Sequence, residues 1–193
     1  MIPPRWATRT SRRLTLDEFA RQFSGEWARI EWRFLKLECW QAYQELDINR
    51  SQEAYRQGDV DRAVELLREE AETDRRLYDD IRSRGIEYSR IRLVQEPLTA
   101  YLHYELLAYR IRASLGEVIE VVRCDTTLSL PNEDFFDFLL FDRHAALIHD
   151  YGDAASQTGG WLTHDPEVLA SLESTAVKMR QAAVPLEQFL EAK

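Results

Sequence analysis

Four residues with acid–base or anion-binding side chains lie close together in the segment FFDFLLFDRHAALIHDYG, residues 135–152. Asp142, Arg143 and His144 are consecutive, and His149 follows five positions later. A histidine beside a carboxylate can act as a general base or as a nucleophile, and an arginine can hold phosphate oxygens. One hypothesis is therefore a phosphoesterase-like hydrolase or transferase that uses Asp142, His144 and His149, with Arg143 as the anion clamp.

The same segment also has an interpretation that needs no catalysis. Phe136, Phe138 and Leu140 alternate with their neighbours as in a strand, and residues 142–144 would form the corner before a second strand, AALIHDY. The sequence has no GxSxG elbow, no glycine-rich phosphate loop and no HExxH motif. We therefore assign no catalytic residue firmly, and we favour a non-catalytic protein over an enzyme.

A second group of candidate residues lies upstream and is more typical of ligand binding. Arg90 and Arg92 share one face of the predicted strand IEYSRIRLV, because side chains alternate along a strand. Tyr101 and Tyr104, on the helix that follows, can border this face. A salt-bridged sheet edge is the alternative interpretation of the two arginines. The predicted ligand-binding residues are Arg90, Arg92, Tyr101, Tyr104, Asp142 and Arg143.

Metal and cofactor sites are not indicated by the spacing of the ligand-type residues. The four histidines, His103, His144, His149 and His164, are dispersed along the chain. Cys39 and Cys124 form no CxxC pair, and free thiols are favoured for them. We expect neither a metal nor a cofactor.

Hydrophobic periodicity predicts the elements that must position these residues. Three- and four-residue spacings indicate helices, two-residue alternation indicates strands, and Gly58 with Asp59 marks a break in the long helical region. The predicted helices cover residues 15–24, 47–84, 97–109 and 165–183. The predicted strands cover residues 34–40, 86–94, 117–124, the two arms of the 136–151 hairpin, and the short segment GWLT. This order predicts an α/β (α+β) fold, with a central mixed sheet of about five to six strands and flanking helices.

Length and charge limit the domain organisation and the partners. The 193 residues suit one domain over residues 14–193, preceded by a flexible leader over residues 1–13 that carries two prolines and four arginines. The formal charge of −9 disfavours direct nucleic-acid binding. No apolar run is long enough for a membrane span or a secretory signal, so a cytoplasmic location is expected.

Several blocks together resemble a known but uncharacterised family. The segments LTLDEFARQF, RIRLVQEPLTAYLHYEL, DFLLFDR and AVPLEQF look like an actinobacterial family that is encoded beside XRE-type helix-turn-helix regulators. The C-terminal half also resembles a phospholipase D-like domain without its catalytic pair. That chemistry needs a lysine two residues after the histidine, and neither His144 nor His149 has one. The resemblance implies a phospholipase D-like fold without its activity.

The favoured function is a non-catalytic regulatory or interaction module. It would be the partner of, or the ligand sensor for, a helix-turn-helix transcription regulator, since an acidic protein suits a basic DNA-binding partner. A small-molecule-binding accessory protein of a biosynthetic operon remains an alternative beside the hydrolase. A homodimer is also left open by the sequence.

Overall fold

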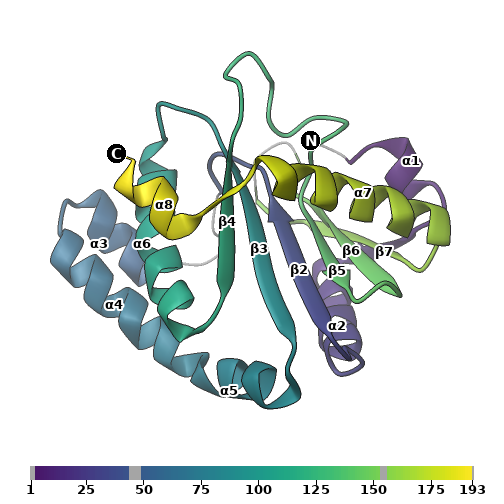
Figure 1. The fold of residues 1–193 in the computed structure, drawn as a ribbon, viewed down its shortest axis with the longest axis horizontal. Coiled ribbons are helices and arrows are strands. Elements are labelled where there is room, and N and C mark those ends of the chain that lie inside the picture. The colour runs from purple at the N-terminus through teal and green to yellow at the C-terminus, as the bar shows by residue number, and fades with distance from the viewer. Residues whose placement is uncertain (1–2, 44–48, 153–155, 193) are drawn as a thin grey trace.

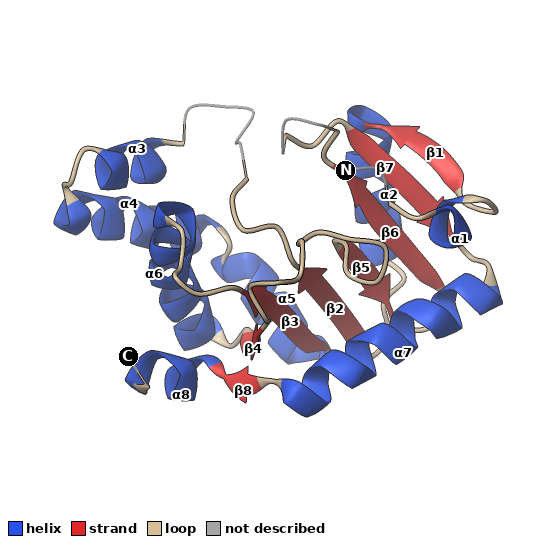
Figure 2. Cartoon of the chain, turned by 90° about the horizontal axis from the view of Figure 1, so that it is seen from above, coloured by secondary structure: helices blue, strands red, loops and turns tan. Residues whose placement is uncertain are grey.

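A computed structural model describes residues 3–43, 49–152 and 156–192 of the chain, and it shows one eight-stranded mixed sheet with helices on both faces (Figures 1 and 2). The strand order is β1-β7-β6-β5-β2-β3-β4-β8. The strands are β1 (Arg12–Thr15), β2 (Arg33–Glu38), β3 (Glu87–Val94), β4 (Val118–Arg123), β5 (Phe138–Phe141), β6 (Ala145–Asp150), β7 (Gly159–Thr163) and β8 (Val184–Pro185).

The sheet has a parallel centre and antiparallel margins. Strands β2, β3 and β4 are parallel, whereas β5, β6, β7 and β1 continue from β2 as antiparallel neighbours. On the other side, the two-residue β8 pairs antiparallel with β4. The predicted α/β class with a mixed central sheet is therefore confirmed.

The helices divide between the two faces of the sheet, as Figure 2 shows from above. α7 lies on one face, together with α1, while α2, α5 and α6 lie on the other, where the α3–α4 pair packs beside α6. α8 packs against α6 and β4 near the β8 edge of the sheet. The helices are α1 (Arg5–Thr8), α2 (Leu16–Trp27), α3 (Arg50–Arg56), α4 (Val60–Thr73), α5 (Arg75–Arg84), α6 (Ala100–Leu115), α7 (Pro166–Ala182) and α8 (Leu186–Glu191).

Local sequence signals account for where several helices begin and end. Thr15 caps α2 in a reciprocal capping box with Glu18, and Asp165 caps α7 immediately before Pro166. Gly85 ends α5 in the left-handed conformation, at a φ of 66°. These three boundaries agree with the sequence prediction.

Alternation along β3 gives the sheet two chemically different faces. Ile91 and Leu93 are fully buried in the hydrophobic core beneath α7. Arg90 and Arg92 point to the opposite face and are also buried, at 4% and 0% exposure. One face of the central sheet is thus apolar, and the other carries buried charges.

The N-terminal segment corrects the expectation of a flexible leader over residues 1–13. From Pro3 onward it contains α1 and the first half of β1, and Ala7 is completely buried in the core under α7. β1 pairs with β7, and Trp6 packs its ring edge against Phe136, with the ring centroids 5.6 Å apart. The segment is ordered because it contributes an edge strand and apolar side chains that its proline- and arginine-rich composition conceals.

Other boundaries differ from the prediction for physical reasons. The sheet has eight strands and not five to six, because β1 and β8 are too short to show a period of two. The 47–84 region forms three helices, with Asp74 between α4 and α5 in addition to the predicted break at Gly58, while residues 44–48 lie outside the described part. α6 begins after Thr99, which caps it, and continues six residues further than predicted, to Leu115. None of the helices in the described ranges has the length and apolar character needed to cross a bilayer.

Candidate functional site

The charged face of the central sheet forms the floor of a cavity of about 840 Å³. Strands β2, β3 and β6 supply the floor, and α3, α4 and α6 supply the walls. Its lining combines four tyrosines with basic, acidic and apolar side chains, including Lys36, Glu38, Tyr43, Leu66, Leu67, Arg90, Tyr101, Tyr104, Glu105, Ala108, Arg112, His149 and Tyr151. A volume of this size is typical of small-molecule sites.

Arg90 joins two buried carboxylates at the centre of this floor. Its Nε donates to Glu117 Oε1 at 2.7 Å, and its Nη1 donates to Glu38 Oε2. Glu38 also pairs with Lys36 Nζ through Oε1, at 2.7 Å, and accepts a hydrogen bond from the Tyr109 hydroxyl at 2.9 Å. The register of β2 and β3 explains the cluster, because it places Lys36 beside Arg90 and Glu38 beside Arg92.

Arg92 makes a second set of buried contacts next to the first. Its Nε donates to Glu105 Oε2 at 3.1 Å, and its Nη2 donates to the backbone oxygen of Trp40. The other oxygen of Glu105 accepts from the Tyr101 hydroxyl at 3.2 Å. Arg92 therefore links β3 to α6 and to the chain that leaves β2.

These contacts decide which groups are charged. Burial alone would raise the pKa of Glu38, but the positive charges of Arg90 and Lys36 hold it well below its usual range. Burial raises the pKa of Glu105, and the charge of Arg92 only partly opposes this effect. Buried ion pairs lose several kcal/mol of hydration per ion, so they are weak evidence for stability. Strongly perturbed pKa values gather at functional sites, which makes this cluster a candidate site.

Asp137 connects the floor to the β5–β6 region. Its carboxylate accepts from the backbone N–H of Cys39 at 2.8 Å and from the Tyr43 hydroxyl, and it is 1% exposed. Burial and the nearby Glu38 charge raise the pKa of Asp137. The Cys39 thiol lies 3.2 Å from the same carboxylate, and burial followed by this negative charge raises its pKa well above the usual value.

His149 lines the cavity and is buried, and its ring nitrogens lack hydrogen-bond partners of good geometry among the described residues. It is 8% exposed and lies between the Tyr151 ring, stacked at 5.4 Å, and the Phe19 ring, at 4.8 Å. Within the described residues, neither ring nitrogen makes a hydrogen bond of good geometry, although the Gln157 side chain approaches the ring. Burial, with the charge of Lys36, lowers the pKa of His149 to about 3, so the ring is neutral near pH 7.

The structure brings together most of the ligand-binding residues predicted on β3 and α6. Arg90, Tyr101 and Tyr104 line the cavity, and Arg92 is buried immediately beside it. Both arginines are salt-bridged, but on an interior strand and not on a sheet edge.

Asp142 and Arg143 lie elsewhere, in the turn between β5 and β6. Asp142 has a positive φ of 50°, and its carboxylate accepts backbone hydrogen bonds from Glu31, Trp32 and Arg33 at 2.8 to 3.1 Å. Arg143 is exposed, and its guanidinium lies 5.8 Å from the Trp32 ring. The structure therefore gives this pair a place in the turn and not in the cavity.

The residues of the hydrolase hypothesis are divided by the length of β6. His144 Nε2 lies 3.1 Å from Glu26 Oε2 at one end of the strand, whereas His149 faces the cavity at the other. Five residues of strand separate the two histidines by roughly 16 Å. Among the described residues, no three histidine, cysteine or acidic side chains are arranged to hold a metal ion.

Sequence reasoning did not select several residues of this cavity, chiefly Lys36, Glu38, Glu105 and Arg112, nor Asp137, which accepts a hydrogen bond from the cavity residue Tyr43. The alternation of Lys36 and Glu38 with Leu35 and Leu37 did place them on one face of β2. The missing step was the parallel pairing of β2 with β3, which joins segments about 50 positions apart.

Residues 17–191 match the model of a family described as a domain of unknown function (DUF6879). The chain belongs to this family. The match spans every element of the cavity, from β2 to α6, and includes the β5–β6 hairpin. A search of curated proteins finds no match to this DUF6879 chain. The cavity geometry is therefore the main guide to its function.

Proposed function

We propose that the DUF6879 chain is a non-catalytic ligand-binding module that acts as the sensor for a helix-turn-helix transcription regulator. The observation that carries the proposal is the cavity over the charged face of β2 and β3. Its floor is a set of ion-paired side chains, and the neutral, buried His149 faces into it. The walls add tyrosine rings with Leu66, Leu67 and Ala108, and a concave site that combines fixed polar groups with aromatic and apolar side chains is suited to binding a ligand.

The state of the reactive groups favours binding over turnover. Cys39 is fully buried, and its raised pKa keeps the thiol protonated, which makes it a poor nucleophile. The pKa of Tyr43 is also raised well above its usual value, by burial and by Asp137. Glu38 and Arg90 neutralise each other at the floor. The hydrolase alternative has less support, since its two histidines lie at opposite ends of β6.

The cavity also offers a physical route from ligand to partner. The α3–α4 pair forms one wall, and it is connected to α6 by the Ser51 hydroxyl, which lies 2.7 Å from the Tyr104 hydroxyl. Tyr104 lines the cavity, so a ligand that contacts it changes the surroundings of the α3–α4 pair. α4 and α5 expose acidic and basic side chains to the surface, and the net charge of −9 suits a basic partner.

A thermal-shift screen with fractionated extract of the source cells tests ligand binding. The control variant is Ala108→Trp, which places a large ring inside the cavity, where Ala108 is 8% exposed. A fraction that raises the melting temperature of the wild type, and raises that of a folded Ala108→Trp variant much less, supports the proposal. Equal shifts in both proteins, or no shift with any fraction, contradict it.

The regulator is tested separately, by affinity capture with the tagged chain. We expect a helix-turn-helix protein to be recovered, and its recovery to change when the active fraction is added. Capture of no such protein, with ligand binding intact, would reduce the proposal to a ligand-binding protein of another pathway.

A further inference from the structure

The hydrogen-bonding groups at the floor of the cavity are unequally satisfied, and its two buried carboxylates, Glu38 and Glu105, are the satisfied ones. Glu69 and Glu70 also line the cavity, but they lie on α4 and are exposed. Both oxygens of Glu38 have donors, in Lys36 on one side and in Arg90 and Tyr109 on the other. Both oxygens of Glu105 also have donors, from Arg92 and Tyr101. These two acids therefore gain little from a ligand that brings further donors.

The donors, in contrast, exceed their partners. A lysine ammonium has three N–H groups, and Lys36 makes an ion pair only with Glu38 among the described residues. Its side chain keeps 26% of its surface exposed, and it lines the cavity. Two of its donors therefore remain for another acceptor.

Arg112 has an even larger donor surplus. It lines the cavity from α6, and it makes no side-chain hydrogen bond or ion pair within the described part of the chain. Burial and the like charge of Arg90 would lower the pKa of Arg112, but the Glu117 carboxylate nearby raises it overall, so the guanidinium stays charged. A half-buried guanidinium whose five N–H groups have no partner among the described residues is suited to binding an anion.

We infer that the cavity binds a small organic anion, a carboxylate or a phosphate monoester, with Lys36 and Arg112 as its main donors. The inference rests on the proposed ligand-binding function and names the class of ligand. His149 supplies one donor and one acceptor, because its ring is neutral. The tyrosine rings, with Leu66, Leu67 and Ala108, provide contacts for a planar or apolar body.

Four probes that share a phenyl ring test the charge preference: benzoate, phenyl phosphate, benzamide and benzylamine. Binding is measured by saturation-transfer NMR and by titration calorimetry at low salt. Arg112→Gln and Lys36→Met remove the two donors. Arg110→Gln is the matched control, because Arg110 is on the same helix, is exposed and lies outside this cavity. Folding of each variant is checked by its melting temperature.

We expect one or both anions to bind, and benzamide and benzylamine to bind at least about tenfold more weakly. Arg112→Gln or Lys36→Met should reduce the affinity for the anion about tenfold, while Arg110→Gln leaves it unchanged. Preference for benzoate or for phenyl phosphate decides between the two anion types. If benzylamine or benzamide binds as tightly as the anions, and this binding is lost in Ala108→Trp, the anion inference is overturned and the proposed function stands. If neither the probes nor any fraction of cell extract shows binding that Ala108→Trp abolishes, both the anion inference and the proposed function are overturned.

Discussion

Replacement of Arg90 by methionine measures how far the buried charges depend on one another. Methionine has a similar length but no charge, and Arg90 is 4% exposed. The change removes one of the two donors to Glu38 Oε2 and the donor to Glu117 Oε1. Glu38 keeps Lys36 and Tyr109, whereas Glu117 keeps the Tyr78 hydroxyl at 3.3 Å. Two carboxylates with weakened partners thus remain in a buried site.

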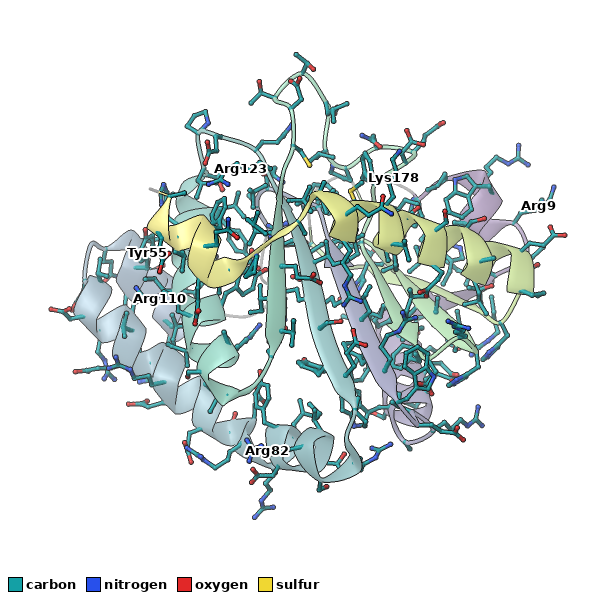
Figure 3. The ribbon with its side chains drawn as sticks, viewed as in Figure 1. Arg9, Tyr55, Arg82, Arg110, Arg123 and Lys178 are labelled. Carbon is teal, nitrogen blue, oxygen red and sulfur yellow. The ribbon has the colours of Figure 1, made fainter. Side chains whose placement is uncertain are left out.

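The expected loss is about 3–5 kcal/mol in the free energy of unfolding, because removing one member of a buried ion pair leaves an uncompensated charge. Total stabilities are about 5–15 kcal/mol, so the loss is a large fraction of the whole. The control is Arg82→Met, since Arg82 pairs with Asp79 at the surface and its side chain is 70% exposed (Figure 3). An exposed pair of this kind contributes less than about 1 kcal/mol.

The loss should also depend on pH with a definite sign. The pKa of Glu38 in the folded protein lies below its unfolded value, since Arg90 and Lys36 outweigh its burial. Its contribution is therefore complete above the unfolded pKa of about 4.3, and it is lost as the pH falls through the folded pKa. Without Arg90 the folded pKa rises, so the difference between wild type and variant is largest near pH 7 and becomes smaller near pH 4.

Urea unfolding followed by tryptophan fluorescence at pH 7 and pH 4.5 measures these differences. A loss below about 1 kcal/mol at pH 7 would refute the reasoning, as would an equal loss at the two pH values. Either result would mean that water or structural relaxation compensates the carboxylates.

Three further perturbations give distinct signatures. His149→Phe should make the stability of the protein less sensitive to acid. The pKa of His149 is about 3 in the folded state, so the unfolded state binds more protons between about pH 3 and 6.5, and wild-type stability rises by roughly 2 kcal/mol between pH 5 and 7. Stability curves that run parallel with pH for the two proteins would contradict this. Asp142→Asn should reduce stability by about 1–3 kcal/mol, because the amide can tolerate the positive φ but places a donor against one of three backbone N–H groups; chemical denaturation measures the loss, and an unchanged midpoint would show that the turn does not need the carboxylate. Gly160→Ala should destabilise by about 1–3 kcal/mol or prevent folding, since a Cβ would lie 2.2 Å from the Ile148 backbone oxygen and 2.7 Å from the Phe19 ring; a thermal melt equal to that of the wild type would count against the close approach of β6 and β7.

The predictions that used local sequence were the most accurate. The two-residue alternation and the preceding Gly85 were enough to predict the strand at residues 86–94. The cap and the proline were enough to predict the helix after Asp165. The same alternation placed Arg90 and Arg92 on one face. Their counter-charges could not be predicted in this way, because Glu38, Glu105 and Glu117 come from β2, from α6 and from the connection between α6 and β4, whose positions depend on the whole sheet.

The Asp142 turn shows the same limit from the other direction. The sequence predicted a corner at residues 142–144, and the structure has one there. The sequence could not predict that the Asp142 carboxylate accepts hydrogen bonds from backbone N–H groups about 110 positions earlier. These bonds explain the presence of an aspartate at this position without any catalytic role. Asp142 stabilises the start of β2, and β2 supplies Lys36 and Glu38 to the cavity floor. A residue selected for its chemistry is therefore connected to the candidate site through the backbone.

The two faces of β3 have different consequences for the protein. Ile91 and Leu93 stabilise the fold by ordinary apolar burial beneath α7. Arg90 and Arg92 lose hydration when buried, and apolar residues of similar volume would often stabilise a fold equally well or better. The proposed ligand in the cavity therefore explains the buried charges of the floor better than their contribution to stability does. An anion that fills the cavity would give Lys36 and Arg112 the acceptors they lack, and it would raise the free energy of unfolding by about 2.7 kcal/mol at one hundred times its Kd. Ligand and fold would then stabilise each other.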